Sequence, residues 1–413
     1  MHVVVIGAGI IGVNTAYYLN AAGCAVTVLE SNAGVAQEAS FGNAGVIAPG
    51  YATPWAAPGM PGKILSYLFK ADAPVRLRPS LDPKLWLWAL RWLRECNLER
   101  YQRNRERMQR LAFYSRAQLH ALRELHDLQY EQSQGYLQLF RSARDLELAE
   151  PGIAMLSAAN VRHRLLTANE CREVEPGLST DDFAGGLHLP EDESGNCPLF
   201  ARQIKDLAAA RGVRFCFGMK AGAIAADAKQ VQVRSGTQIL EGDAVVLATG
   251  AASSRLLRPL GLRVPLYPVR GYSATVAVRE PTYAPQHALM DEAYKVAMTR
   301  LGNRIRIAGM AELGGHAGAP RQAALATLIK VARDWFPGAA DYGRATYWSG
   351  WRPMLPDGPP VLGATRQARV WVNLGHGSTG WAMAAGSARI LADLITGRTP
   401  EIALDGLTMA RYA

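Results

Sequence analysis

The chain has 413 residues, of which 49% are hydrophobic and 19% are charged. This length and composition exclude a disordered chain and a disulfide-stapled miniature protein, and they allow two domains around one large ligand. Lysines and arginines outnumber aspartates and glutamates by 45 to 35, which gives a formal net charge of +10. Such a surface attracts anions and anionic lipid, but the charge alone names no partner.

The cysteine pattern and the start of the chain favour a cytoplasmic protein. The five cysteines are odd in number and form no CxxC pair, so neither a zinc ribbon nor a regular disulfide framework is expected. The first predicted strand begins at residue 2, without the segments of a signal peptide, and no run of 18 apolar residues predicts a membrane span. Peripheral contact with the inner face of the cell membrane remains open.

The first segment in chain order predicts a βαβ unit. Residues 2–6 are a β-branched run, glycines follow, residues 14–22 have helical spacing, and residues 25–29 form a second apolar strand. Residues 41–79 are rich in Gly, Pro and Ala, which predicts an extended, irregular segment that wraps a ligand.

The rest of the chain alternates between strand and helix patterns. Helices are predicted over residues 84–94, 100–125, 197–211, 321–335 and 381–396. Strands are predicted over residues 135–141, 213–217, 231–234, 244–248, 266–278, 295–299, 304–308 and 370–373. The three strands between residues 266 and 308 suggest an antiparallel sheet. The arginine-rich helix 100–125 comes with no nucleic-acid-binding motif, so its charge is interpreted as a solvated face and no nucleic-acid partner is expected.

A dinucleotide fingerprint stands at the first strand-to-helix turn. Gly7, Gly9 and Gly12 form GxGxxG, where missing side chains permit the turn and let a pyrophosphate approach the helix N-terminus. Glu30 ends the second strand and can accept both ribose hydroxyl hydrogens. Further cofactor contacts are predicted in the same two turns, at Ile10, Ile11 and Ser31. The alternative is a glycine turn that serves helix packing only.

Because NAD and FAD share the ADP half, the fingerprint does not distinguish these cofactors. Later segments of the chain do. The predicted strand 244–248 leads into Thr249 and Gly250, a pattern familiar from two-domain flavoproteins. A second glycine turn opens the last helix and comprises Gly375, His376, Gly377, Ser378, Thr379 and Gly380. The N–H groups of that helix N-terminus could lie against flavin N1 and the C2 carbonyl; a plain turn with a Ser or Thr cap is the alternative.

Seven stretches, in order, carry a family resemblance. They are VVVIGAGIIGV, EASFGNAGVIAPGYATPWAAPG, GYSATV, DEAYKVAMTR, NRIRIAGMAE, YWSGWRPMLPDGPPVLG and NLGHGSTGWAMAAGS. The chain resembles the D-amino acid dehydrogenase small-subunit family, within the FAD-dependent D-amino acid oxidase and glycine oxidase superfamily. The resemblance implies an α/β fold with a Rossmann-type FAD-binding domain (residues 1–80, 185–260 and 350–413). It also implies a substrate domain (residues 81–184 and 261–349) with a mostly antiparallel sheet and flanking helices.

The resemblance also implies site residues. Arg352 would form a bidentate pair with the substrate carboxylate; a strand cap or a pair with Asp357 is the alternative. Tyr294, expected on the neighbouring strand, would offer its hydroxyl to the same carboxylate, unless it only packs the sheet. Tyr51 and Trp55 would wall the substrate cavity. The loop under the flavin would contain Ser40, Asn43, Ala44 and Gly45. FAD is expected without a covalent link, His376 as a residue that shapes the backbone, and no metal is expected.

The expected reaction is removal of a hydride from a D-amino acid to FAD. The imino acid then reacts with water to give a 2-oxo acid and ammonia, and the electrons pass to a quinone or another respiratory acceptor. Three alternatives stay open: an oxidase that uses O₂, a D-proline or hydroxyproline dehydrogenase, and a flavin-binding subunit that is active only with partner chains.

One predicted helix is relevant to the identity of the electron acceptor. Residues 84–94 read KLWLWALRWLR, and such a basic, Trp-rich helix could enter the headgroup region of a membrane and bring the flavin near quinone. Ordinary burial against the second domain is the other interpretation.

Overall fold

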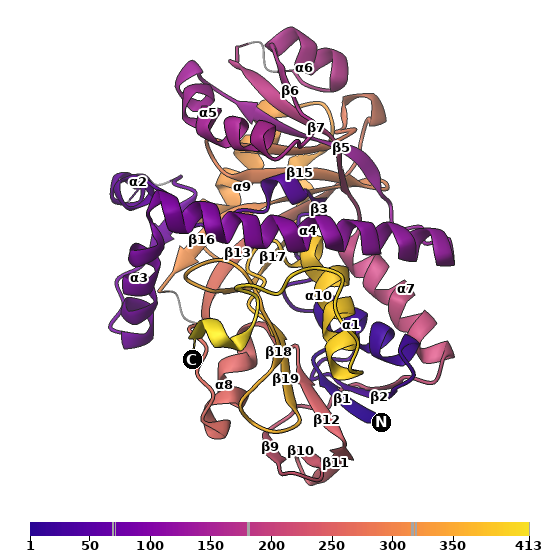
Figure 1. Cartoon of the computed structure of the whole chain (residues 1–413). Helices are drawn as coiled ribbons and strands as arrows, with labels where there is room; N and C mark the ends of the chain where they lie inside the picture. The colour runs from indigo at the N-terminus through magenta and orange to yellow at the C-terminus, as the bar shows by residue number, and fades with distance from the viewer. Residues whose placement is uncertain (68–69, 71, 180–181, 315–317, 319, 413) are drawn as a thin grey trace.

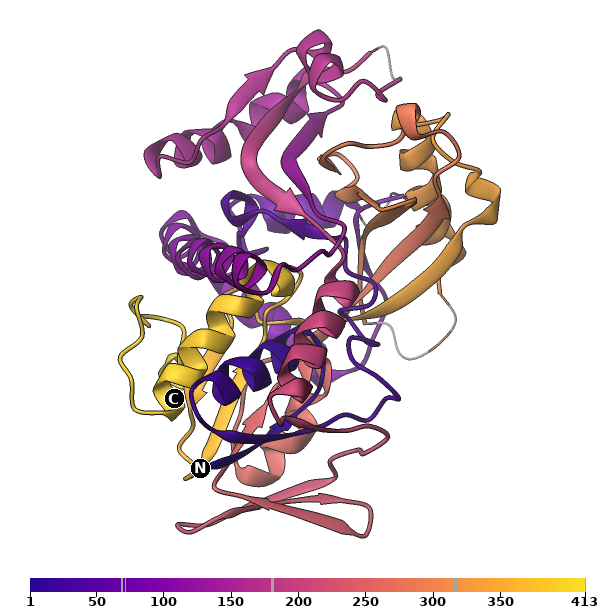
Figure 2. The same ribbon diagram turned by 90° about the vertical axis from the view of Figure 1, so that its right-hand side faces the viewer.

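The computed structural model describes residues 1–67, 70, 72–179, 182–314, 318 and 320–412. It contains a six-stranded sheet, a ten-stranded sheet and a small three-stranded sheet. In Figures 1 and 2 the six-stranded sheet with both chain termini lies in the lower half, and the ten-stranded sheet lies in the upper half. The long helix α4 (Leu98–His126) crosses the molecule between these halves (Figure 1).

The six-stranded sheet contains the predicted βαβ unit. Its strand order is β18-β19-β12-β1-β2-β8, and all neighbours are parallel except β18 and β19. The strands are β1 (His2–Ile6), β2 (Ala25–Leu29), β8 (Arg214–Cys216), β12 (Ala244–Leu247), β18 (Val361–Ala364) and β19 (Val370–Leu374). Strands buried on both faces need continuous apolar runs, which is why β1 and β12 were visible in the sequence.

Helices cover both faces of this sheet. One face packs against α1 (Ile10–Ala21), α7 (Cys197–Ala210) and α10 (Gly380–Ile395). The other face packs against α8 (Ser253–Leu257) and the small sheet β9 (Ala223–Ala226), β10 (Val231–Ser235) and β11 (Gln238–Gly242). Together with the fingerprint turn, this confirms the predicted Rossmann-type architecture.

The ten-stranded sheet is mostly antiparallel, as expected. Its main order is β17-β13-β16-β15-β14-β5-β7-β3, with β4 on β16 and β6 on β7. The strands are β3 (Val46–Ile47), β4 (Val75–Leu77), β5 (Ser133–Phe140), β6 (Arg164–Leu166), β7 (Gly185–Ser194), β13 (Tyr267–Ala277), β14 (Ala288–Asp291), β15 (Val296–Leu301), β16 (Arg304–Leu313) and β17 (Thr346–Met354). Helix α9 (Gln322–Trp335) packs on it around the buried Trp335. Strands β3 and β7 join this sheet, although the predicted boundaries give residues 46–47 and 185–194 to the FAD-binding domain.

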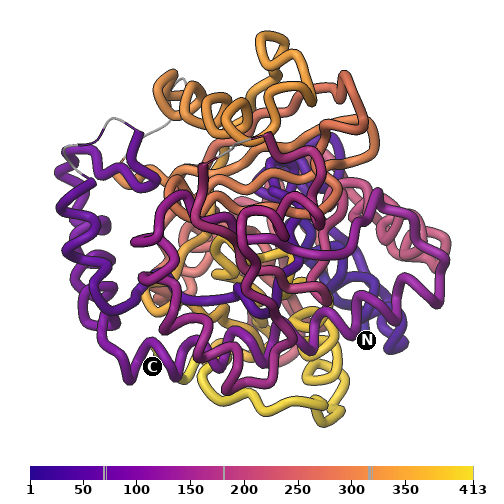
Figure 3. The backbone as a smooth tube through the Cα atoms, turned by 90° about the horizontal axis from the view of Figure 1, so that it is seen from above, coloured from indigo at the N-terminus to yellow at the C-terminus, as the bar shows by residue number. Residues whose placement is uncertain are grey.

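The segment 41–79 is more regular than predicted. Besides β3 and β4, its described residues include the helix α2 (Met60–Tyr67), so the prediction of a purely irregular segment is wrong there. Helices α5 (Ala143–Ala158) and α6 (Ala168–Val174) lie where no element was predicted. Helix α3 (Pro83–Glu95), which precedes α4 in the chain, lies at the edge of the molecule (Figure 3). In the part of the chain described, every helix is too short or too polar to cross a bilayer.

Candidate active site

A large cavity reaches from the fingerprint turn of the six-stranded sheet to strands β13, β16 and β17 of the ten-stranded sheet. Its volume is about 2170 Å³, whereas pockets for drug-sized ligands reach roughly 1,000 Å³. The cavity therefore has room for an extended cofactor and a small substrate together.

The three fingerprint glycines have different local tasks. Gly7 has a φ of 102°, and a Cβ there would lie 2.6 Å from the carbonyl oxygen of Ala248. A Cβ on Gly12 would lie 1.8 Å from the carbonyl oxygen of Gly7, so both residues must be glycine for the turn and the helix to pack. Gly9 lines the cavity, and a Cβ there would meet only Ser40 Oγ, at 3.4 Å. Gly9 thus leaves the backbone open to a close ligand.

Glu30 is a fixed carboxylate at the end of β2. It is buried and lines the cavity beside Ser31. Its Oε2 accepts the Ala8 N–H at 2.7 Å, and its Oε1 accepts the Asn32 N–H at 2.8 Å. These bonds hold the carboxylate at the position where such an acidic residue accepts hydrogen bonds from the ribose hydroxyls of a dinucleotide.

A second helix N-terminus lines the same cavity. Helix α10 packs against α1, and its N-cap residue Thr379 makes no side-chain capping bond to any residue that the structure describes. The alternative of a plain Ser or Thr cap is therefore not supported. The first N–H groups of a helix have no intrahelical partner, and the helix dipole there favours negative charge. The two N-termini of α1 and α10 fit the two ends of a flavin dinucleotide.

His376 lies between β19 and α10 and is 3% exposed. Its Nε2 is 3.2 Å from Ser387 Oγ. Burial lowers the pKa of His376 to about 3, so the imidazole is neutral at pH 7. These observations agree with a residue that shapes the turn.

Most of the predicted cofactor residues lie together along the cavity wall. Those that line it are Gly7, Gly9, Ile10, Ile11, Glu30, Ser31, Ser40, Asn43, Ala44, Thr249, Gly250, Gly375, His376, Gly377, Ser378, Thr379 and Gly380. Gly12 and Gly45 are not among the described residues that line the cavity. The buried Asn373, which was not predicted, also lines the cavity, and its Oδ1 has no partner among the described residues. A ligand that donates a hydrogen bond would satisfy this atom.

Arg352 projects into the cavity from β17. Its Nη1 donates to the Met310 carbonyl at 2.7 Å, and its Nη2 donates to the Gly309 carbonyl at 3.3 Å. Burial lowers its pKa to about 10, so the guanidinium remains charged at neutral pH. Within the described part of the chain it pairs with no carboxylate. Asp357, the proposed alternative partner, instead pairs with Arg411 at 2.7 Å.

A glycine in the neighbouring strand makes room for this guanidinium. A Cβ on Gly271, in the adjacent strand β13, would lie 2.5 Å from Arg352 Cζ. The register of β13 against β16 shifts between Arg270 and Tyr272, opposite the carbonyls that hold Arg352. A charged guanidinium that lies in a cavity and pairs with no carboxylate of the described residues matches a substrate carboxylate.

Tyr51 forms a polar cluster with two residues that were not predicted. The Tyr51 hydroxyl donates to Glu292 Oε1 at 3.0 Å and accepts from Lys295 Nζ at 3.2 Å, and Lys295 also pairs with Glu292. Tyr51, Lys295 and Trp55 line the cavity. Glu292 and Lys295 belong to the stretch DEAYKVAMTR, which was one of the stretches that carry the family resemblance. The spacing of residues in that stretch did not indicate which side chains point into the cavity.

The structure does not bring Tyr294 to the cavity wall. Tyr294 lies in the turn between β14 and β15 and, among the described residues, is not one that lines the cavity. Its hydroxyl accepts from Lys330 Nζ of α9 at 3.0 Å, and its ring packs under the guanidinium of Arg141. The turn directs its side chain to the face of the sheet that α9 covers, which is the packing role weighed as the alternative.

Comparison with known proteins agrees with this geometry. The family model "FAD dependent oxidoreductase" matches residues 2–394. D-amino acid dehydrogenase of Bradyrhizobium diazoefficiens is 46% identical over 417 residues, which cover 100% of this chain and 99% of that protein. D-amino acid dehydrogenase of Vibrio cholerae is 44% identical over 416 residues, with coverage of 100% and 99%.

Solved structures show the same fold at low identity. Glycine oxidase from Geobacillus kaustophilus aligns with a TM-score of 0.76 and 21% identity, over 100% of this chain and 98% of that one. L-proline dehydrogenase from P. horikoshii aligns with a TM-score of 0.77 and 17% identity, over 100% and 97%. Because the family model and the full-length relatives both span this chain, it belongs to the FAD dependent oxidoreductase family, and FAD is its cofactor.

Proposed function

We propose that this enzyme oxidises D-amino acids to imino acids, which water converts to 2-oxo acids and ammonia. The observation that carries the proposal is Arg352, a charged guanidinium without an acid partner in the described residues, in the same cavity as the fingerprint turn. The chirality and the amino acid class rest on the relatives named D-amino acid dehydrogenase.

The cofactor would be held along the cavity wall described above. The N-terminus of α1 and Glu30 would hold the ADP half, and the N-terminus of α10 would face the flavin. When bound, FAD supplies a hydride acceptor for the substrate α-carbon. Ser40 fixes the α1 N-terminus, because its Oγ accepts the Ile10 N–H at 3.0 Å.

The protein groups then bind and orient the substrate. Arg352 holds the carboxylate through the N–H groups that its backbone carbonyl partners leave free. The positive charges of Arg352 and Lys295 favour the neutral form of the substrate amine, since a nearby cation lowers the pKa of an ammonium group. His376, with its low pKa, is a weak base, so we infer that the amine proton leaves to water.

For the electron acceptor, we propose a membrane quinone or another respiratory acceptor that is reached by peripheral contact. Trp88 and Trp92 of α3 are buried, as the packing interpretation expects, but Leu87 and Leu90 are 61% and 56% exposed. Other exposed apolar residues nearby are Leu65, Leu81, Trp86 and Leu93. Leu87 also lines the large cavity, which supports an approach for a lipophilic acceptor from this face.

Two measurements test these proposals. Anaerobic mixing with D-alanine should bleach the flavin absorbance, whereas L-alanine should not; no bleaching with either enantiomer across a panel of amino acids would refute the proposed activity. Reoxidation by a soluble quinone should outpace reoxidation by air, and the reverse would indicate an oxidase.

Membrane contact is tested by sedimentation with phosphatidylcholine vesicles. The pair Leu87→Ser and Leu90→Ser should reduce vesicle binding, and Leu148→Ser, at an exposed leucine of α5, should not. Equal binding of both variants would exclude α3 as the contact.

A further inference from the structure

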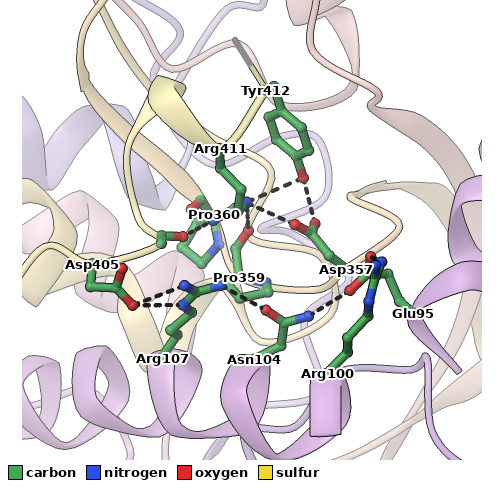
Figure 4. Close-up of polar contacts among 11 residues, drawn as sticks. Glu95, Arg100, Asn104, Arg107, Asp357, Pro359, Pro360, Asp405, Arg411 and Tyr412 are labelled. Atoms are coloured by element: carbon green, nitrogen blue, oxygen red, sulfur yellow. Dashed lines mark hydrogen bonds and ion pairs between the residues drawn. The ribbon is translucent and has the colours of Figure 1, made fainter. Parts of the chain in front are cut away.

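A second, smaller cavity lies where α3, α4 and the C-terminal segment meet. Its volume is about 260 Å³. Figure 4 shows the end of α3, the start of α4, the loop at Asp357 and the C-terminal Arg411 and Tyr412 converging there. The arginines that line it are Arg91, Arg94, Arg100, Arg103, Arg107 and Arg411.

The carboxylates in the lining of this cavity are already neutralised. Glu95 accepts from Arg100 Nη1 at 2.6 Å and from Asn104 Nδ2 at 3.1 Å. Asp357 pairs with Arg411 at 2.7 Å and accepts from the Tyr412 hydroxyl. The side chains of Arg411 and Asp357 are only 10% and 9% exposed, so these contacts form a fixed frame that ties the C-terminal segment to the loop after β17.

Arg91, Arg94 and Arg103 have little compensating negative charge, whereas Arg107 is paired. Arg91 and Arg94 are exposed and pair with no carboxylate in the described ranges. Arg103 reaches Glu99 at 3.8 Å, but Glu99 is 86% exposed, and such a surface pair contributes little. Arg107 pairs with Asp405 at 2.8 Å. Crowded guanidinium groups repel one another unless an anion lies between them.

The geometry points to a binding site for a single phosphate group. Arginine forks match phosphate oxygens in a bidentate manner, and the frame around Arg411 holds part of the site in place before a ligand arrives. The volume is below the range of roughly 300–1,000 Å³ for drug-sized ligands, which favours a compact anion. The phosphate could be free inorganic phosphate or the phosphodiester of an anionic lipid, since the exposed leucines of α3 lie beside the site.

The test uses the full-length, FAD-loaded protein and two probes at constant ionic strength. Inorganic phosphate is titrated by calorimetry, and vesicles of phosphatidylcholine with or without phosphatidylglycerol are used for sedimentation. The test variant combines Arg94→Glu with Arg103→Glu. The control combines Arg144→Glu with Arg162→Glu, at exposed arginines at the start of α5 and beyond its end, and has the same change in net charge.

The wild type and the control should bind, and the test variant should bind at least about tenfold more weakly, since the loss of even one charge-assisted bond has about this effect. Binding of inorganic phosphate with this pattern identifies a free-phosphate site, whereas binding only to vesicles that contain phosphatidylglycerol identifies a lipid headgroup. The milder pair Arg94→Gln and Arg103→Gln should shift binding in the same direction. Equal binding by the test and control variants, or no binding of the wild type to either probe, would overturn the inference. Flavin reduction by D-alanine in the same samples reports separately on the proposed activity.

Discussion

The placement of Arg352 makes Gly271→Ala a sharp test, because the substitution leaves the arginine in the sequence and disturbs only its position. The added Cβ would lie 2.5 Å from Arg352 Cζ and Nη1, and 2.7 Å from Nη2. Carbon atoms in contact normally stay about 3.5–4.0 Å apart, so the guanidinium must move by about 1 Å. Its bond to the Met310 carbonyl, 2.7 Å long, cannot survive such a shift unchanged. The displaced guanidinium would also lose a hydrogen bond to the substrate carboxylate. Such a bond to a charged group contributes roughly 1.5–3 kcal/mol, so KM for the amino acid should rise about tenfold or more.

The assay is steady-state oxidation of D-alanine with an artificial acceptor, together with the flavin content of the purified protein. FAD content should equal that of the wild type, since Gly271 lies outside the fingerprint turn. Gly222→Ala is the matched control, because a Cβ there would find its nearest neighbour, the carbonyl oxygen of Arg234, at 3.6 Å. Arg352→Lys should show a comparable rise in KM. If Gly271→Ala keeps both KM and FAD content, the assignment of Arg352 to the substrate carboxylate is wrong.

Further predictions concern the cofactor, the amine and pH stability. Glu30→Ala should weaken FAD affinity about tenfold, because Ala8 N–H and the ribose lose a charged acceptor; equilibrium dialysis measures it, and unchanged affinity would remove Glu30 from the ribose site. Lys295→Met should move the acid limb of the kcat profile to higher pH, since loss of the cation raises the pKa of the bound amine, and an unmoved profile would show that Lys295 does not act on the amine. Between about pH 6.5 and pH 3 the stability of the wild type should fall by about 1.4 kcal/mol per pH unit on account of His376 alone, because its folded pKa of about 3 lies below the ordinary value of 6.5 and the unfolded chain binds the proton first. His376→Asn should remove this part of the acid loss in pH-dependent denaturant unfolding, and parallel curves would contradict the burial argument.

Local signals made most of the six-stranded sheet predictable, although its edge strand β18 was missed. The fingerprint turn, the apolar runs of β1 and β12 and the acid at Glu30 each lie within one short segment, so periodicity and glycine spacing were sufficient. The ten-stranded sheet depends on pairings between distant segments, such as β3 with β7 and β4 with β16. Strands β3 and β4 have two and three residues, too few for an alternation pattern, and helix α2 was hidden by the Gly and Pro content around it.

In the candidate site, too, features within one short segment could be predicted, whereas features that depend on distant segments could not. Arg352 could be proposed from its motif, but the space that Gly271 leaves for it depends on the register of β13 against β17, which no single stretch encodes. The second cavity brings Arg94 and Arg103 together with Arg411, which is far from them in the sequence. Its basic residues look like solvated helix faces in sequence, because the concavity appears only after the C-terminal segment returns to α4.

The family resemblance pointed to Tyr294 as a cavity residue, but the structure places the neighbouring Lys295 there. The backbone conformation of the turn explains the difference. Tyr294 and Lys295 lie in the turn between β14 and β15, where the alternation of an extended strand does not hold, so the motif could not say which of the two side chains faces the cavity. The turn decides: the Tyr294 N–H donates to Asp291 Oδ1 at 2.9 Å, and Lys295 adopts a φ of 51°. This left-handed residue directs the ammonium of Lys295 toward Tyr51 and leaves Tyr294 on the α9 side. Because a left-handed conformation is costly for a residue with a side chain, its presence at the cavity wall supports the proposal that the Lys295 ammonium, rather than the Tyr294 hydroxyl, faces the substrate.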